Sequence, residues 1–139
     1  MFDKILDETE MAAVNAHLLR ARGEVITRVS LDQWSVSLVF ADCLLFVEGH
    51  WNYTGPSGEL LDRMVDLSGR AHFALWRMVG QSLESVAIDD HVLGNVAIVT
   101  SNGDRLVACG DDNDFEDWTL TGPGISVVCM GHTQWISRP

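Results

Sequence analysis

The hexapeptide Trp51-Asn-Tyr-Thr-Gly-Pro56 recurs later in the chain as Trp118-Thr-Leu-Thr-Gly-Pro123. Each copy follows two stretches in which apolar residues recur at every second position, which is the pattern of β-strands. These stretches correspond in order, 35–40 with 95–100 and 44–49 with 105–110. The sequence therefore predicts two similar β-meanders, each ending in the motif W-x-x-T-G-P.

Helical spacing flanks the first meander on both sides. Apolar residues between Asp7 and Arg22 lie three or four positions apart, and Gly23 follows where a C-terminal helix cap belongs. Residues 57–80 show similar spacing. We therefore expect a second helical segment that joins the two meanders and is broken near Ser68.

Together these patterns predict an α+β fold that is mainly antiparallel β. The N-terminal helix is expected to occupy residues 1–23, followed by a single β-rich domain over residues 24–139. Within that domain the meander repeats cover 24–56 and 81–135, and the helical segment covers 57–80. A chain of 139 residues with 47% hydrophobic residues is long enough to build one such core.

Three of the five tryptophans lie in phase with the apolar positions of these elements. We assign Trp34, Trp76 and Trp118 to the core, where burial of each side chain contributes roughly 2 to 3 kcal/mol. The pattern leaves Trp51 and Trp135 unassigned.

The cysteines and the N-terminus bear on the compartment. Cys43, Cys109 and Cys129 are odd in number and form no C-x-x-C pair, which argues against a disulfide framework and a zinc site. The N-terminus lacks the basic start and long apolar stretch of a secretory signal. No apolar run approaches the roughly 20 residues of a membrane-spanning helix. We expect a soluble cytoplasmic protein with buried thiols and no contact with a membrane.

Acidic side chains outnumber basic ones by 20 to 9, which gives a net charge of -11. This balance disfavours nucleic acid and anionic lipid as direct partners, because phosphate binding needs clustered Lys and Arg. Six acids and a single base lie between Asp104 and Asp117, so one loop carries much of the excess. The sequence therefore predicts a basic protein as the partner.

The spacings typical of catalytic and metal sites are missing from the sequence. None of the five histidines lies in H-x-x-x-H or H-E-x-x-H, and no serine lies in G-x-S-x-G. Cys109 and Cys129 lie within apolar alternation, where a thiol is usually a packing residue. We expect no catalytic residue, no metal site and no cofactor.

Several short motifs resemble a known family when they are read in order. They are Leu75-Trp-Arg-Met-Val-Gly80, Phe115-Glu-Asp-Trp118, Thr121-Gly-Pro123 and Val127-Val-Cys129. The order Y/F-E-x-W, glycine turn and V-V-C resembles the hallmark of a family of small uncharacterised bacterial proteins, over residues 24–135. The chain departs from it at Met130-Gly-His-Thr133, where the family carries Pro-Gly-Gly, and in its additional N-terminal helix. In size, acidity and hairpin content such proteins resemble bacterial toxin-immunity proteins.

These observations predict a function in binding. We expect an immunity protein that covers the basic active-site cleft of a toxin with the loop Gly110–Asp117. The expected partner-binding residues are acidic or aromatic and lie together in this loop: Asp111, Asp112, Asp114, Phe115, Glu116 and Asp117.

Two alternatives stay open at this stage, and the chain is expected to be a monomer or a homodimer. A phage counter-defence protein that mimics nucleic acid would carry acids along a whole face, whereas residues 118–139 contain no Asp or Glu. A small-ligand binder or enzyme would use a cleft between the two halves, with His50, His91 or His132 as acid or base.

Overall fold

The computed structural model describes residues 4–32, 35–64, 74–90, 94–109, 116–130 and 133–136. Helical structure in these residues comprises helix α1, Glu8–Leu18, and two 3-10 turns, η1, Leu19–Ala21, and η2, Ala74–Met78. The strands are β1 Lys4–Ile5, β2 Ile26–Leu31, β3 Val36–Phe40, β4 Cys43–Val47, β5 Trp51–Thr54, β6 Leu60–Arg63, β7 Leu83–Asp90, β8 Asn95–Thr100, β9 Arg105–Ala108, β10 Glu116–Gly122, β11 Ile125–Met130 and β12 Thr133–Ile136.

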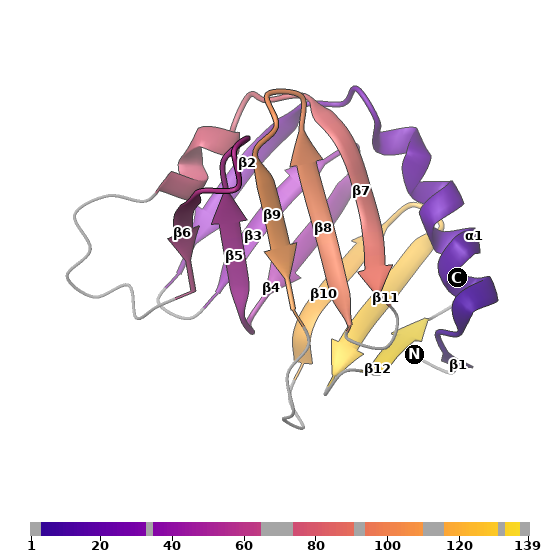
Figure 1. Ribbon diagram of the computed structural model, residues 1–139. Helices are drawn as coiled ribbons and strands as arrows, with labels where there is room; N and C mark the ends of the chain where they lie inside the picture. Colours follow the sequence, from indigo (N-terminus) through magenta and orange to yellow (C-terminus); the bar gives the residue numbers. More distant parts are fainter. Residues whose placement is uncertain are drawn as a thin grey trace.

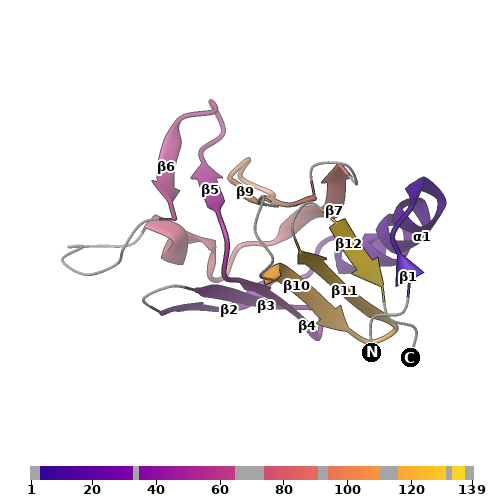
Figure 2. The same ribbon diagram turned by 90° about the horizontal axis from the view of Figure 1, so that it is seen from below.

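The strands form two sheets that pack as layers (Figure 1 and Figure 2). The larger sheet has the order β1-β12-β11-β10-β4-β3-β2, and the smaller sheet has the order β6-β5-β9-β8-β7. Neighbouring strands of the described chain pair antiparallel throughout. The predicted α+β fold, mainly antiparallel β with an N-terminal helix, is confirmed.

Each half of the chain contributes strands to both sheets. β2, β3 and β4 form a meander in the larger sheet, after which the chain passes to the smaller sheet, where β5 pairs with β9. The second half does the reverse: β7, β8 and β9 form a meander in the smaller sheet, and β10 then pairs with β4 in the larger one. The two halves are therefore interleaved.

The strand registers confirm the repeat seen in the sequence. Trp51, which is 3% exposed, lies opposite Ala108, and Trp118 lies opposite Val47. The repeat matches Trp51 with Trp118 and Val47 with Ala108, so each tryptophan faces the same position of the other half. The structure thus places W-x-x-T-G-P where each half joins the sheet of the other.

A pseudo-two-fold axis relates the halves. Val25 forms an isolated antiparallel bridge with Ser82, its own equivalent in the second half. The backbone hydrogen bonds on either side of this bridge form two pairs, and the axis exchanges the two members of each pair. In the first pair, Gly23 N donates to Leu83 O and Gly80 N donates to Ile26 O, both at 2.8 Å. In the second pair, Leu83 N donates to Glu24 O at 2.8 Å and Ile26 N donates to Gln81 O at 2.9 Å.

The tryptophans test the predicted core. Trp118 is 1% exposed, as predicted, whereas Trp76 is 52% exposed, so its assignment to the core is wrong. A 3-10 turn repeats every three residues, which directs Leu75 and Met78 of η2 inward and leaves Trp76 outside. Trp34 lies outside the described residues.

The prediction of a helical segment over residues 57–80 is wrong for its first residues. Leu60–Arg63 is strand β6, which pairs with β5. The turn between the two strands closes with a hydrogen bond of 2.9 Å from Gly55 N to Glu59 O, and Gly58 within it has a φ of 82°. Because Gly58 can adopt this conformation, the chain turns back and pairs with β5 as a strand, although the spacing of its apolar residues is helical. Residues 65–73 lie outside the described part.

Helix α1 lies along the edge of the smaller sheet (Figure 1). Val14 and Leu18 are buried on its inner side. Asn15 Nδ2 donates to Ile88 O at 3.0 Å, and Asn15 Oδ1 accepts from Ile88 N at 2.7 Å. Because β7 is an edge strand, Asn15 occupies backbone groups that would otherwise be open to another strand. In the described residues, no helix combines the length and apolar character that crossing a membrane requires.

Candidate functional site

The predicted partner-binding loop emerges at one end of the molecule, which we name the crossover end. Here β4 and β9 end and β5 and β10 begin, at the bottom of Figure 1. Residues 110–115 connect β9 to β10, and Glu48 directly follows β4. The place where the chain changes sheets is therefore also the place where its most acidic segment is attached.

The six predicted binding residues are placed unequally by the structure. Four of them lie outside the described residues: Asp111, Asp112, Asp114 and Phe115. Glu116 is the first residue of β10. Asp117 is 1% exposed, so it contributes no exposed carboxylate to this surface. Its carbonyl accepts hydrogen bonds from Glu48 N and Gly49 N, both 2.9 Å, and these bonds fasten the base of the loop to the end of β4.

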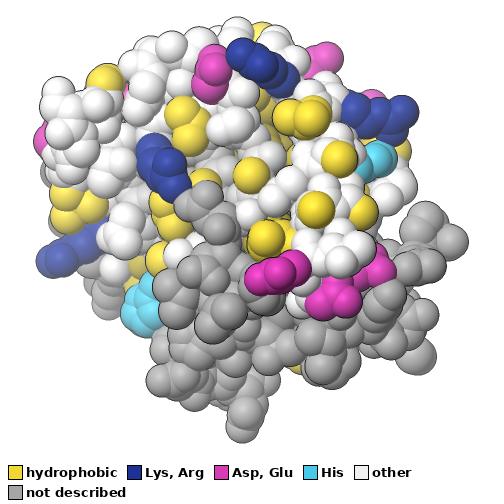
Figure 3. Space-filling model, turned by 45° about the vertical axis from the view of Figure 1, so that its right-hand side comes forward, with side chains coloured by type: hydrophobic (Ala, Val, Ile, Leu, Met, Phe, Trp, Pro, Cys, Tyr) yellow, Lys and Arg dark blue, Asp and Glu magenta, His cyan; other side chains and the backbone are white. Residues whose placement is uncertain are grey.

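Exposed acids lie at the same end of the molecule as the base of this loop. Glu48 follows β4 and Asp32 follows β2, and the side chains of both are exposed. α1 begins at the same end of the molecule with the exposed residues Asp7 and Glu8. Figure 3 shows acidic side chains in the middle of this view, beside the grey residues, and further acidic side chains near Lys and Arg at its top. The crossover end is thus acidic in its described residues as well.

Buried Trp118 lies beneath the loop at the crossover end and links neighbouring strand ends there. Its indole Nε1 donates to Gly94 O at 2.8 Å, which ties the start of β10 to the segment before β8. The thiol of Cys129 lies 3.6 Å from the same carbonyl oxygen. These contacts hold three strand ends together beneath the loop.

A cavity of about 550 Å³ lies at the opposite end, between the end of α1, the start of β2 and the β3–β4 turn. The turn residues Ala41 and Asp42 have φ values of 48° and 61°, as two-residue hairpin turns require. His17 Nε2 lies 2.8 Å from Pro123 O, so the helix end is joined to the β10–β11 turn across one wall. The volume falls within the range of small-molecule sites.

This cavity differs from the ligand cleft expected between the two halves. Pro123 alone among its walls comes from the second half of the described chain. Among the histidines expected to act there, His50 lies at the crossover end, and His91 and His132 lie outside the described residues. The cavity contains His17 instead.

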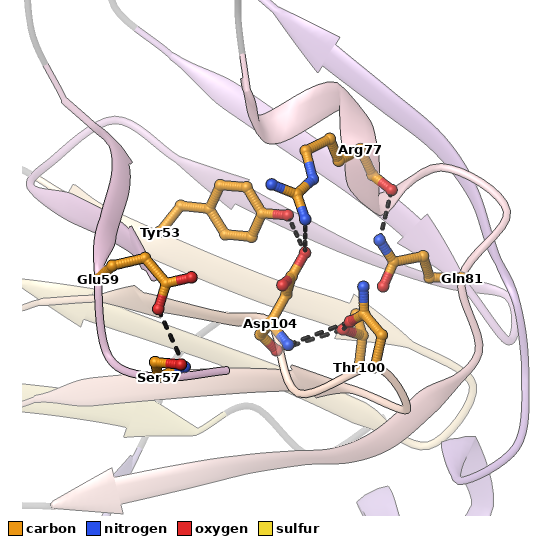
Figure 4. A network of polar contacts seen from close by, with 8 residues as sticks. Tyr53, Ser57, Glu59, Arg77, Gln81, Thr100 and Asp104 are labelled. Atoms are coloured by element: carbon orange, nitrogen blue, oxygen red, sulfur yellow. Dashed lines mark hydrogen bonds and ion pairs between the residues drawn. The ribbon is translucent and has the colours of Figure 1, made fainter. Parts of the chain in front are cut away.

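A buried polar cluster occupies the corresponding place in the second half (Figure 4). Tyr53 OH donates to Asp104 Oδ2, and an Arg77 guanidinium nitrogen lies 3.6 Å from the same oxygen. Asp104 is 0% exposed, and its Oδ1 makes no hydrogen bond within the described chain. Asp104 was one of the six acids counted between residues 104 and 117, but the structure places it in the interior.

Burial changes the ionisation of several groups near these sites. The pKa of Tyr53 is raised well above its ordinary value, chiefly by burial and then by the hydrogen bond to Asp104. Burial, and secondarily the charge of Asp42, raises the pKa of the Cys43 thiol. Burial and the charge of Asp117 likewise raise the pKa of Cys109. All three cysteines are free thiols, and these two are held in the protonated, less nucleophilic form.

The side chains that form metal sites are dispersed in this structure. No group of three His, Cys, Asp or Glu side chains is close enough to hold an ion, as far as the described ranges extend.

Sequence reasoning missed the Tyr53–Asp104 pair, although the repeat contains its signal. The first copy of W-x-x-T-G-P has Tyr53 where the second has Leu120, and Asp104 directly precedes β9 at the position where Cys43 begins β4. At both positions one half has a polar side chain where the other half has an apolar one. Two such differences in the same half indicate that the two polar side chains contact each other.

Comparison with known proteins gives a family match over most of the chain. The matched model describes a family of unknown function, DUF6188, and covers residues 17–135. The match starts near the end of α1, so most of this helix precedes it. No curated protein and no solved structure matches the chain. Because the match spans far more than half of the sequence, the chain belongs to the DUF6188 family of unknown function.

Proposed function

We propose that this protein binds a basic protein through its crossover end and thereby inhibits it, most specifically as an immunity protein that neutralises a toxin. The observation that supports this proposal is the position of the acidic loop. Residues 110–115 are attached between strands whose ends are fixed by Trp118 and by the carbonyl of Asp117. Exposed Asp32 and Glu48 lie at the same end.

Electrostatics favours a basic partner. A net charge of -11 and a concentration of acids at one end attract a cationic protein and accelerate its association. Three described acids, Asp62, Asp104 and Asp117, are buried, so they do not contribute to this surface. Exposed acids also lie at the opposite end, among them Glu24, Asp42 and Glu84, so it is the acidic loop that distinguishes the crossover end, and a rigid base reduces the ordering cost of binding.

The resemblance to immunity proteins supplies the more specific part of the proposal. The order of Phe115-Glu-Asp-Trp118, a glycine turn and Val127-Val-Cys129 resembles the hallmark of a family of small uncharacterised bacterial proteins. In size, acidity and hairpin content those proteins resemble immunity proteins. Buried Trp118 and Cys129 make these motifs part of the floor beneath the loop.

The experiment begins with capture of basic proteins on the immobilised chain at low and at high salt. For a captured protein, association rates are compared between the wild type and the variant with Lys at Asp111, Asp112, Asp114 and Glu116. A second variant carries Asp32→Lys and Glu48→Lys. The matched control for this second variant carries Glu24→Lys and Glu84→Lys, which change the net charge by the same amount at exposed positions of the opposite end.

The proposal predicts that both crossover-end variants associate at least about tenfold more slowly and lose most of their salt dependence, while the control variant changes little. Inhibition of the captured protein must fall in parallel. Equal slowing by the control pair would show that only net charge matters and would contradict the crossover-end surface. Loss of binding from substitutions on every face would favour the nucleic-acid mimic.

A further inference from the structure

Arg20 and Arg77 are equivalent residues in the two halves. Each lies in a 3-10 turn, η1 or η2, three residues before a glycine with positive φ, 83° at Gly23 and 84° at Gly80. The hydrogen bonds of 2.8 Å from the two glycine N–H groups are related by the pseudo-two-fold axis. The fold therefore carries the two arginines to corresponding places.

In the second half, the space beside the arginine is filled by the carboxylate of Asp104. The Arg77 guanidinium lies 3.6 Å from Asp104 Oδ2, and the same oxygen accepts a hydrogen bond from Tyr53 OH. Asp104 is completely buried while Arg77 is half exposed. The arginine covers a carboxylate that the turn before β9 presents to it.

In the first half, the carboxylate is missing and the place is open. Cys43 stands where Asp104 stands, and Leu120 stands where Tyr53 stands. Arg20 lines the cavity of about 550 Å³ together with Cys43. No ion pair of Arg20 occurs within the described ranges. Cys43 brings no carboxylate to this place, so the cavity has the positive charge of Arg20 without the negative charge that Asp104 supplies in the other half.

Acids in the same cavity restrict what can enter it. Glu24 and Asp42 line it and are both exposed, and the ring of His17 forms part of the wall at Pro123. A simple anion would meet Arg20 but would also meet two carboxylates, which oppose it. A molecule that carries both signs of charge can pair with both.

We propose that this cavity binds a small zwitterion of the amino-acid type. Its carboxylate pairs with Arg20 as the Asp104 carboxylate pairs with Arg77, and its ammonium group pairs with Asp42 and Glu24. Leu18, Val25 and Val39 supply apolar walls for an aliphatic side chain. The site lies at the end opposite the crossover end and is independent of the proposed protein-binding function.

Three matched probes separate the two charge requirements. L-leucine carries both groups, 4-methylpentanoate lacks the ammonium group, and 3-methylbutylamine lacks the carboxylate. Binding to the full chain is followed by backbone amide NMR shifts and by calorimetry. We expect leucine to bind at least about tenfold more tightly than either probe, because each lost charge pair removes a charge-assisted hydrogen bond of roughly that worth. Shifts should centre on residues 17–27 and 39–43.

Variants assign each charge to its partner. Arg20→Gln should weaken leucine about tenfold and leave 3-methylbutylamine unchanged, while Asp42→Asn with Glu24→Gln should weaken leucine and leave 4-methylpentanoate no weaker. Arg22→Gln is the control, because Arg22 pairs with Glu84 at 3.4 Å, outside the cavity. Circular dichroism verifies that each variant is folded, and Arg20→Lys provides a charge-conserving second variant at this position.

The proposal is overturned if leucine binds no better than the single-charge probes. It is also overturned if a folded Arg20→Gln variant binds leucine as the wild type does, or if the shifts fall at the crossover end. Binding of the captured basic protein by Arg20→Gln should equal that of the wild type, so failure of the cavity proposal and failure of the inhibitor proposal are separate outcomes.

Discussion

Val25 pairs with Ser82, the residue that occupies the position of Val25 in the other half of the chain. A residue that pairs with its own equivalent must lie on the axis that relates the two halves. The pairing of β5 with β9 and of β10 with β4 follows the same symmetry. The chain therefore folds like two intertwined copies of one unit, and several consequences can be measured.

Neither half should fold alone. Fragments divided within residues 65–73 leave β9 without β5 and β4 without β10, so each loses an inner strand pairing. We expect each fragment to be unfolded by circular dichroism and an equimolar mixture to regain the β-sheet spectrum. A folded first fragment by itself would contradict the interleaved fold.

The hydrogen bond between Tyr53 and Asp104 should contribute measurably to stability. Tyr53→Phe removes a donor from a fully buried carboxylate, and we expect a loss of about 1.5 to 3 kcal/mol in the free energy of unfolding in urea. The control is Arg77→Gln at the half-exposed ion pair, which should cost less than about 1 kcal/mol. Equal effects of the two variants would count against a dominant role of the tyrosine.

Alkaline pH should destabilise the protein through Tyr53. Its pKa is raised in the folded state, so the unfolded chain loses the phenolic proton first, near pH 10. Stability is therefore complete below about pH 10 and falls as pH rises above it. Tyr53 is the single tyrosine of the chain, so absorbance of the tyrosinate reports it directly. Asp104→Asn should lower this pKa, and Tyr53→Phe should remove the tyrosine contribution to the alkaline loss.

Asn15 should protect the edge of the smaller sheet. Asn15→Ala removes both hydrogen bonds to Ile88, and we expect a loss of about 1 to 3 kcal/mol together with increased aggregation on heating. The control is an alanine-to-serine substitution at the exposed position Ala12 of the same helix. Unfolding by urea and light scattering measure the two effects. An unchanged scattering profile would argue against edge protection.

Gly23 and Gly80 should respond alike to substitution. A Cβ at either position meets no atom within 4 Å, so the cost of alanine comes from the positive φ alone, about 1 kcal/mol at each. Gly122→Ala is the contrasting variant, because its Cβ would lie 2.5 Å from Cys43 Sγ and should cost more. Unequal losses at the first two positions would contradict the equivalence of the two halves.

The sequence contains one further part of the repeat that we did not use in the prediction. Leu18 to Gly23 and Leu75 to Gly80 share the pattern L-x-R-x-x-G. We predicted a terminal helix in one and the end of a linker helix in the other, because helical spacing was the stronger signal. The structure shows the same 3-10 turn and glycine in both.

The sequence by itself determined the fold class, the repeat and the hairpin turns, because alternation of apolar residues and the turn residues act over a few positions. Which sheet receives β5 and β10 was decided only in the tertiary structure, since those pairings join segments more than fifty residues apart. The same holds for the charges. Asp104 is an interior residue because Tyr53 and Arg77 converge on it from two distant elements, and without such partners a carboxylate remains at the surface.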